Sequence, residues 1–258
     1  MLDVDAAVAL AEGIADAARP IVLGYFRSDV RIESKFDASP VTVADREAEA
    51  AMRRLIEQIY PQHGIIGEEY GRVRSSARYV WVLDPIDGTK SFVTGKPLFG
   101  TLIALLRDGE PVVGVIDMPA LGERWVGVAG RPTVFNRQIV KVRPCVELGA
   151  AWLYATSPEM FAGPDNADAF TRLRTRCRAA VYGADCYAYG LLANGTVDIV
   201  CEASMQPYDY CAAVPVITGA GGMITDWQGQ PLDLASDGRV LAAGDPAIHA
   251  AAREALAA

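Results

Sequence analysis

The chain has 258 residues, of which 51% are hydrophobic and 22% are charged, so it can bury a sizeable core and is not disordered throughout. Its net charge of −8, without any basic stripe, excludes the electrostatic footprint of a nucleic-acid-binding protein. Five cysteines form no CxxC pair and only two histidines are present, which argues against a disulfide framework, a histidine-based zinc site and a Ser-His-Asp triad.

The first residues carry acids where a signal peptide requires positive charge. No apolar run approaches the roughly 20 residues that are needed to span a bilayer. We therefore expect a soluble, cytoplasmic protein without a membrane partner.

The first half of the chain predicts two helices followed by a mostly antiparallel sheet. Residues 3–26 place apolar side chains at helical spacing, and Pro20 should kink this helix or end its first part. Residues 31–43 predict a loop or hairpin, after which Thr42 is a plausible N-cap for a second helix that Pro61 ends. The segment 107–110 is typical of a hairpin turn. Strands are expected at residues 65–66, 79–83, 101–106, 112–116 and 124–128.

The second half alternates between strands and helices, which indicates an α/β layer. Strands are expected at residues 152–155, 179–182, 197–201, 223–225 and 240–242, and helices at residues 166–176, 185–193, 209–220 and 246–256. We place a subdomain boundary near residues 133–143. The chain is then one domain over residues 1–258, with subdomains of about 1–135 and 136–258.

The most informative segment is the sequence DPIDGT at residues 84–89, which follows an apolar strand. If a helix or turn begins at Asp87, the amides of Gly88 and Thr89 could bind a phosphate group. The carboxylates of Asp84 and Asp87 would repel that phosphate unless hard divalent cations, chiefly Mg²⁺, lay between them. The alternative is that these acids merely shape turns, which turn chemistry alone favours.

Three further signals have ordinary explanations when they are taken singly. Glu68, next to Glu69, follows a short strand and would by itself belong to a solvated turn. Asp209 opens an expected helix, where an N-cap is the commoner role for aspartate. The glycine-rich residues 219–222 would by themselves form a helix C-cap or a tight turn.

Together, these segments closely resemble the three signature regions of the inositol monophosphatase-like family. The matching sequences are GEE at residues 67–69, DPIDGT at 84–89, and YD at 208–209 followed by GAGG at 219–222. Residues 35–45 resemble the N-terminal metal loop of that family. The order and spacing match over nearly the whole chain, and DPIDGT is highly specific. The resemblance implies a layered αβαβα sandwich of the inositol monophosphatase and fructose-1,6-bisphosphatase type, in the α+β or α/β class, and a homodimer.

By resemblance, the chain is a Mg²⁺-dependent phosphomonoesterase with two or three cations in each active site. The implied ligands of the first cation are Glu68, Asp84, Asp87 and the carbonyl of Ile86. Those of the second cation are Asp84, Asp87 and Asp209. Asp45, with Asp37 as a further candidate, would lie toward a third, weaker cation site. Glu68 and Thr89 would orient and deprotonate a metal-bound water that attacks phosphorus, without a covalent enzyme intermediate.

The resemblance also places the phosphate of a small phosphomonoester. The amides of Gly88 and Thr89, together with Ser91, would bind its oxygens. Lys35 and Lys90 are candidates for supporting positive charge, and each is equally well explained as a solvated surface lysine.

The substrate is not fixed by the family signature. Residues 94–106 and 207–217 look like plant and bacterial histidinol-phosphate phosphatases, and Tyr208-Asp209 stands where inositol monophosphatases usually have Trp-Asp. Asp185, at a position where inositol enzymes have a small residue, and Glu202 would face the leaving group. Two acids there suit a cationic alcohol such as histidinol. An N-cap role for Asp185 is an equal alternative, and Glu202 also serves inositol recognition in relatives.

We therefore expect hydrolysis of L-histidinol phosphate in histidine biosynthesis. The alternatives within the same class are an inositol monophosphatase and a 3′-phosphoadenosine 5′-phosphate nucleotidase. The alternative from a different class is a non-catalytic protein that binds Mg²⁺ or phosphoesters.

Overall fold

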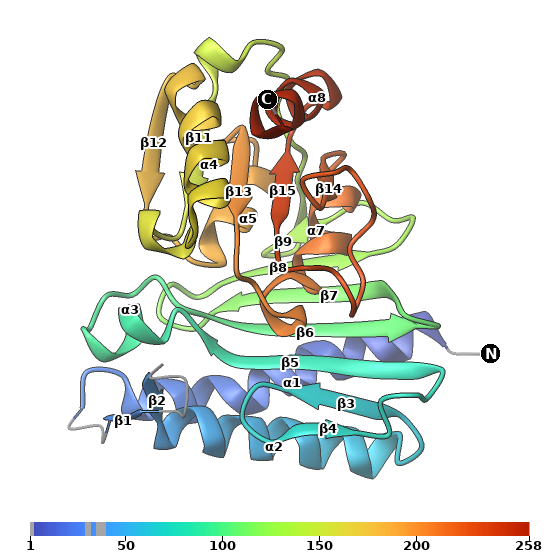
Figure 1. Ribbon diagram of the computed structural model, residues 1–258. Coiled ribbons are helices and arrows are strands. Elements are labelled where there is room, and N and C mark those ends of the chain that lie inside the picture. Colours follow the sequence, from blue (N-terminus) through green and yellow to red (C-terminus); the bar gives the residue numbers. More distant parts are fainter. Residues whose placement is uncertain (1–2, 29–31, 35–39, 258) are drawn as a thin grey trace.

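The computed structural model describes residues 3–28, 32–34 and 40–257, and arranges them in alternating layers of helices and sheets (Figure 1). Two long helices cover one face of an eight-stranded sheet, short helices separate this sheet from a five-stranded one, and two further helices cover the outer face of the second sheet. The predicted layered αβαβα sandwich is confirmed.

The outer helices α1 (Val4–Tyr25) and α2 (Val43–Ile59) begin at side-chain caps. Asp3 accepts the amides of the first turn of α1, and Thr42 forms a capping box with Asp45, which confirms Thr42 as the N-cap. Helix α1 runs on past Pro20, so the expectation that this proline ends its first part is wrong. The apolar stripe continues beyond the proline to the fully buried Val22, which keeps the last turn packed on the sheet.

The larger sheet has the order β10-β9-β8-β7-β6-β5-β3-β4, and its one parallel pair among the described residues is β3 with β5. Its strands are β3 (Gly64–Gly67), β4 (Gly71–Val73), β5 (Tyr79–Asp87), β6 (Gly100–Arg107), β7 (Glu110–Met118), β8 (Glu123–Val128), β9 (Val134–Phe135) and β10 (Gln138–Ile139). Alternation along β5 sends Val80 and Val82 toward the middle helices, and Trp81 and Leu83 toward α1 and α2. A separate pair is formed by β1 (Ile32–Ser34) and β2 (Pro40–Thr42).

The smaller sheet has the order β12-β11-β13-β15-β14, with β11 parallel to both of its neighbours and β15 antiparallel to both of its neighbours. Its strands are β11 (Trp152–Ala155), β12 (Ala179–Tyr182), β13 (Ile199–Glu202), β14 (Met223–Thr225) and β15 (Val240–Ala243). Helices α4 (Pro164–Arg176) and α8 (Pro246–Ala257) cover its outer face, and the 3-10 turns η1 (Leu148–Ala150) and η2 (Pro158–Met160) flank β11. Among the described residues, no helix combines the length and apolar character needed to cross a bilayer.

The middle layer holds α5 (Tyr187–Ala193), α6 (Pro207–Tyr210) and α7 (Ala213–Gly219). The expected single helix over residues 209–220 is therefore wrong, since it is two short helices. Helix α7 lies directly on a cross-strand pair of glycines, Gly114 and Gly127, where a Cβ atom would collide with the backbone that runs from Ala212 to Val216. These glycines let the helix approach the sheet closely, which fixes the position of α6 just before it.

Candidate active site

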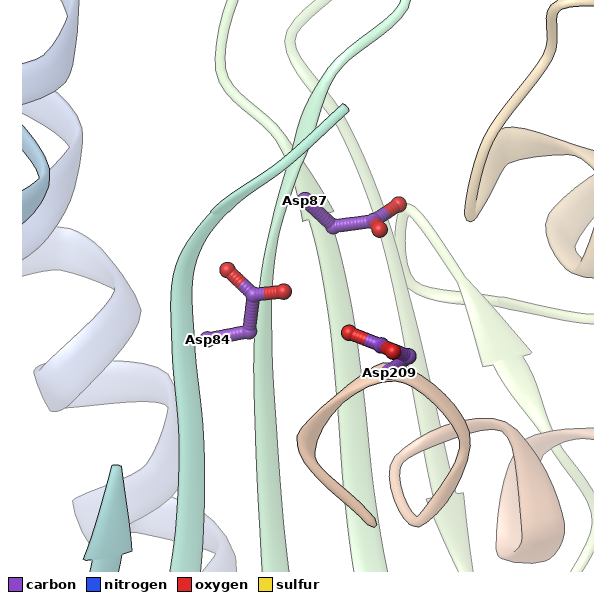
Figure 2. Close-up of side chains that lie close together, drawn as sticks. All are labelled: Asp84, Asp87 and Asp209. Carbon is purple, nitrogen blue, oxygen red and sulfur yellow. The ribbon is translucent and has the colours of Figure 1, made fainter. Parts of the chain in front are cut away.

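Three carboxylates from distant parts of the chain converge at one end of β5. Asp84 and Asp87 lie at the end of this strand and Asp209 lies in α6, on the opposite side of the gap between them (Figure 2). Each can present one carboxylate oxygen within 4.8 Å of the others. Carboxylate oxygens gathered in this way are the ligands that hard divalent cations prefer.

A β-bulge puts Asp84 and Asp87 on the same side of the sheet. In a regular strand, residues three apart face opposite sides. Here Asp84 pairs with Leu102 while Asp87 pairs with Gly100, so β5 contains one extra residue, and that residue restores the common direction. The amide of Ile86 donates a hydrogen bond to Asp84 Oδ1 at 3.0 Å, which fixes the first carboxylate within the bulge.

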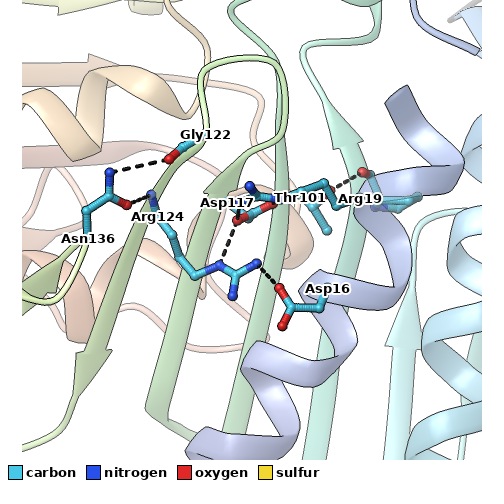
Figure 3. Close-up of polar contacts among 8 residues, drawn as sticks. Asp16, Arg19, Thr101, Asp117, Gly122, Arg124 and Asn136 are labelled. Carbon is cyan, nitrogen blue, oxygen red and sulfur yellow. Dashed lines mark hydrogen bonds and ion pairs between the residues drawn. The ribbon is translucent and has the colours of Figure 1, made fainter. Parts of the chain in front are cut away.

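The bulge is supported from behind by Thr101 of β6, whose hydroxyl donates to the carbonyl of Pro85 at 2.8 Å. Thr101 pairs across the sheet with Asp117, which is fully buried. Arg19 of α1 and Arg124 of β8 both donate to Asp117, the latter at 2.7 Å, and Arg124 also binds Asp16 (Figure 3). A buried carboxylate needs such partners, and this network fastens α1 to the sheet next to the strand pair that carries the site.

The second half of the chain fixes the other two sides of the cluster. The amide of Cys186 donates to Asp87 Oδ2 at 2.7 Å, across the boundary between the layers. Asp209 accepts the amide of Gln206 at 2.6 Å in a capping box, and Gln206 is the N-cap of α6. The alternative in which Asp209 is itself the N-cap is therefore wrong.

The cluster is electrostatically unfavourable without a positive charge. Burial, followed by the charges of Glu68 and Asp87, raises the pKa of Asp84 well above its ordinary value. Burial, followed by the charge of Asp185, raises the pKa of Asp87 to about 7. Like charges that are held together and partly desolvated are stabilised by protons or cations, so these residues fit a divalent cation.

Two predicted cation ligands lie at the edge of this cluster. Glu68 follows β3, its amide donates to the carbonyl of Leu83 at 3.3 Å, and its charge acts on Asp84. Asp45 is buried, its charge also acts on Asp84, and its carboxylate accepts the amide of Thr42 at 2.9 Å. Its capping role is therefore observed, while its role toward a third cation stays a prediction. Lys35 and Asp37 lie outside the described residues.

The DPIDGT segment ends in a tight turn before α3 (Thr89–Val93). Gly88 is the N-cap of this helix and has a φ of +83°, in the left-handed region that favours glycine. A Cβ atom at Gly88 would also lie only 2.9 Å from Asp185 Oδ2. The hydroxyl of Thr89 donates to the carbonyl of Ile86 at 3.2 Å, which holds the turn closed over the bulge.

Asp185 and Glu202 line the same cavity as the carboxylate cluster of Asp84, Asp87 and Asp209. This cavity has a volume of about 310 Å³ and is also lined by Glu68, Asp87, Thr89, Lys90 and Asp209. Asp185 has a φ of +49° and accepts a hydrogen bond from Ser91 at 2.8 Å. Helix α5 begins at Tyr187 with Cys186 as its N-cap, so the N-cap alternative for Asp185 is wrong. Ser91 is buried and its hydroxyl is directed to Asp185, and a phosphate contact for Ser91 stays a prediction.

Glu202 is 1% exposed and is held by a residue that the sequence analysis did not single out. The amide of Thr156, just after β11, donates to both carboxylate oxygens at 3.1 Å, and its hydroxyl donates to Oε1. Burial nevertheless raises the pKa of Glu202 well above its ordinary value. Met160 and Met205 also line the cavity and were missed, because no local pattern connects them with DPIDGT.

A larger cavity of about 630 Å³ lies at the far end of the molecule, between α4 and α8. It is lined by Trp227 and by arginines rather than by a convergent set of carboxylates. The smaller cavity at the end of β5 is therefore the candidate active site.

Comparison with known proteins agrees with this geometry, since a model of the inositol monophosphatase family matches residues 3–258. The chain belongs to the inositol monophosphatase family. It is 49% identical to the chloroplastic bifunctional phosphatase IMPL2 of Arabidopsis thaliana, over 98% of this chain and 76% of that protein. It is 38% identical to the histidinol-phosphatase of Mycobacterium tuberculosis, over 85% of this chain and 87% of that protein.

The solved structure of an inositol monophosphatase from Zymomonas mobilis has a TM-score of 0.92 and 45% identity, and the alignment covers 100% of both chains. The predicted family and fold are thus confirmed. The protein is a phosphatase of the inositol monophosphatase family, which hydrolyses phosphomonoesters, and its acidic cluster is compatible with the Mg²⁺ that this family uses.

Proposed function

We propose that this phosphatase hydrolyses L-histidinol phosphate to L-histidinol and phosphate, as a step of histidine biosynthesis. The observation that carries the proposal is a pair of carboxylates, the half-buried Asp185 and the buried Glu202, in the same cavity as the carboxylate cluster. Histidinol carries an amine and an imidazole, and desolvated carboxylates favour such cations over neutral polyols. The histidinol-phosphatase of Mycobacterium tuberculosis, at 38% identity, supports this choice.

The proposed cation ligands are Asp84, Asp87, Asp209, Glu68 and the carbonyl of Ile86, with Asp45 nearby for a third ion. Two or three Mg²⁺ ions there would supply Lewis acidity and neutralise the charge of the phosphate. Burial, followed by repulsion from the neighbouring carboxylates, raises the pKa of Asp84 and Asp87, which is consistent with this role.

The remaining chemistry belongs to the turn that follows the bulge. We assign Glu68 and Thr89 to orient the attacking water and to accept its proton, because both line the cavity. The Thr89 hydroxyl donates its hydrogen bond to the carbonyl of Ile86, so its oxygen lone pairs can accept a hydrogen bond from that water. The amides of Gly88 and Thr89 would bind the phosphate oxygens.

A phosphate-release assay tests the assignment with L-histidinol phosphate, inositol 1-phosphate and 3′-phosphoadenosine 5′-phosphate, with Mg²⁺ and with chelator. We expect the highest kcat/KM for histidinol phosphate, and no release in chelator. A higher kcat/KM for inositol 1-phosphate would overturn the assignment and support the second candidate, which the likeness to the Zymomonas mobilis inositol monophosphatase favours. Mg²⁺ binding without hydrolysis of any ester would instead indicate a binding protein.

Two variants test the role of the acid pair. Asp185→Asn and Glu202→Gln should lower kcat/KM for histidinol phosphate more than for the neutral-alcohol ester p-nitrophenyl phosphate. The matched control is Asp168→Asn, which removes an exposed carboxylate on α4. Equal losses on the two esters would contradict recognition of a cation by these acids.

A further inference from the structure

Tyr189 stands out in the cavity because its hydroxyl has no hydrogen-bond partner among the described residues. The residue is 1% exposed and lies in α5, within the core between the two sheets. It also lines the cavity that holds the carboxylate cluster. A buried hydroxyl without a partner is uncommon, because it loses its bonds to water and gains none in return. The oxygen therefore calls for an explanation that the packing of the ring does not supply.

The surroundings of this hydroxyl are acidic. Burial, followed by the charges of Glu202, Asp87, Cys201 and Asp209, raises the pKa of Tyr189 well above its ordinary value, so the group keeps its proton. Glu202 accepts from the amide and hydroxyl of Thr156, and no hydrogen bond joins it to the Tyr189 hydroxyl. The tyrosine is thus a neutral donor and acceptor placed among carboxylates that bind other groups.

We propose that the Tyr189 hydroxyl is a specificity-determining contact that binds the polar, nitrogen-bearing part of the leaving alcohol beside Glu202. This inference rests on the proposed function and adds a residue to the same site. The lone pairs of the Tyr189 hydroxyl accept a hydrogen bond from an ammonium or imidazole N–H of the alcohol, while the carboxylates supply the opposite charge. The hydroxyl is left without a partner until the substrate arrives, which makes an ester that lacks such a donor a poorer ligand.

The test compares wild type with Tyr189→Phe, which removes only the oxygen and keeps the buried ring. For the variant, kcat/KM on histidinol phosphate should fall roughly tenfold, as expected for one lost hydrogen bond to a charged group, and kcat/KM on p-nitrophenyl phosphate should change by less than about twofold. Inhibition by free histidinol should weaken by a similar factor, while inhibition by inorganic phosphate should not change. The Tm without substrate should be equal or higher, since the lost oxygen had no partner among the described residues.

The control is Tyr187→Phe on the same helix, whose hydroxyl interacts with Glu123 rather than with the carboxylates of the cavity. It should leave the ratio of the two kcat/KM values unchanged. If Tyr189→Phe lowers kcat/KM equally for both esters, or for neither, the inference is overturned. If the wild type prefers another ester, the proposed function fails, and the same comparison of that ester with p-nitrophenyl phosphate still decides whether Tyr189 contacts the leaving alcohol.

Discussion

Replacing Asp87 by asparagine should stabilise the metal-free protein at and above neutral pH while abolishing activity. Burial and the neighbouring carboxylates raise the pKa of Asp87 from 3.8 to about 7, so holding this group ionised opposes folding. Each pKa unit corresponds to about 1.4 kcal/mol, which sets an upper bound of roughly 4 kcal/mol. The amide oxygen of asparagine can still accept the bond from the Cys186 amide, so the link between the layers survives.

The effect should depend on pH with a definite sign. The folded-state pKa of Asp87 lies above the unfolded value, so the folded protein binds this proton more tightly. The resulting stabilisation of the wild type is fully present below the unfolded pKa of about 3.8 and is lost as the pH rises through about 7. The side-chain amide of the variant does not titrate, and the advantage of Asp87→Asn should therefore grow from pH 4 to pH 8.

Urea unfolding in chelator, at several pH values between 5 and 8, measures this difference. We expect a gain of about 1–3 kcal/mol at pH 8, below the bound because neighbouring carboxylates share the proton. With Mg²⁺ at about 100 times its Kd, the wild type should gain about 2.7 kcal/mol, most of which the variant should lose. The control Asp168→Asn should follow the wild type. A variant that is less stable than the wild type at pH 8 in chelator, or a gain that is the same at pH 5 and pH 8, would refute the reasoning.

Three further substitutions test how the site is supported. Thr101→Val should cost about 1–3 kcal/mol in urea unfolding and raise the Mg²⁺ concentration needed for half-maximal activity, because the buried carbonyl of Pro85 loses its donor. An unchanged Mg²⁺ dependence of activity would indicate that the bulge keeps its conformation without the hydrogen bond from Thr101. Gly127→Ala should lower stability by about 1–3 kcal/mol and reduce kcat, since its Cβ atom would push α7 away from the sheet; an unchanged Tm would contradict this close contact. Ser91→Ala should raise KM for histidinol phosphate several-fold through Asp185 and leave p-nitrophenyl phosphate unaffected, whereas an equal loss on both esters would favour a phosphate contact.

The sequence predicts which residues form the site better than it predicts the contacts that hold them in place. Asp84, Asp87 and Asp209 are recognisable because a hard cation needs carboxylates, and carboxylates at the ends of strands and the starts of helices are visible in a linear pattern. Their convergence within 4.8 Å agrees with that expectation. The capping box at Thr42 was predictable for a similar reason, because its two partners are only three residues apart.

The features that were missed depend on residues far apart in the chain. Asp185 has a positive φ and accepts a hydrogen bond from Ser91, which lies in the other half of the chain, whereas local preference alone would place an aspartate at a helix cap. The chain between α6 and α7 likewise lies against the distant Gly114 at Ala212, while the apolar spacing of residues 209–220 predicts one helix. Thr156 carries no local signal of its partner, Glu202.

The glycine pair beneath α7 sets the thickness of the molecule at its centre. Because backbone rests on backbone at Gly114 and Gly127, no rotamer can adjust the spacing between the larger sheet and the middle helices there. Asp209 comes from the helical side of that contact, and Asp84 comes from the sheet side. The distance between the carboxylates of the cation site thus depends on having glycine at both positions. Any larger residue at either position should move α6 away from β5 and change which ion fits the site.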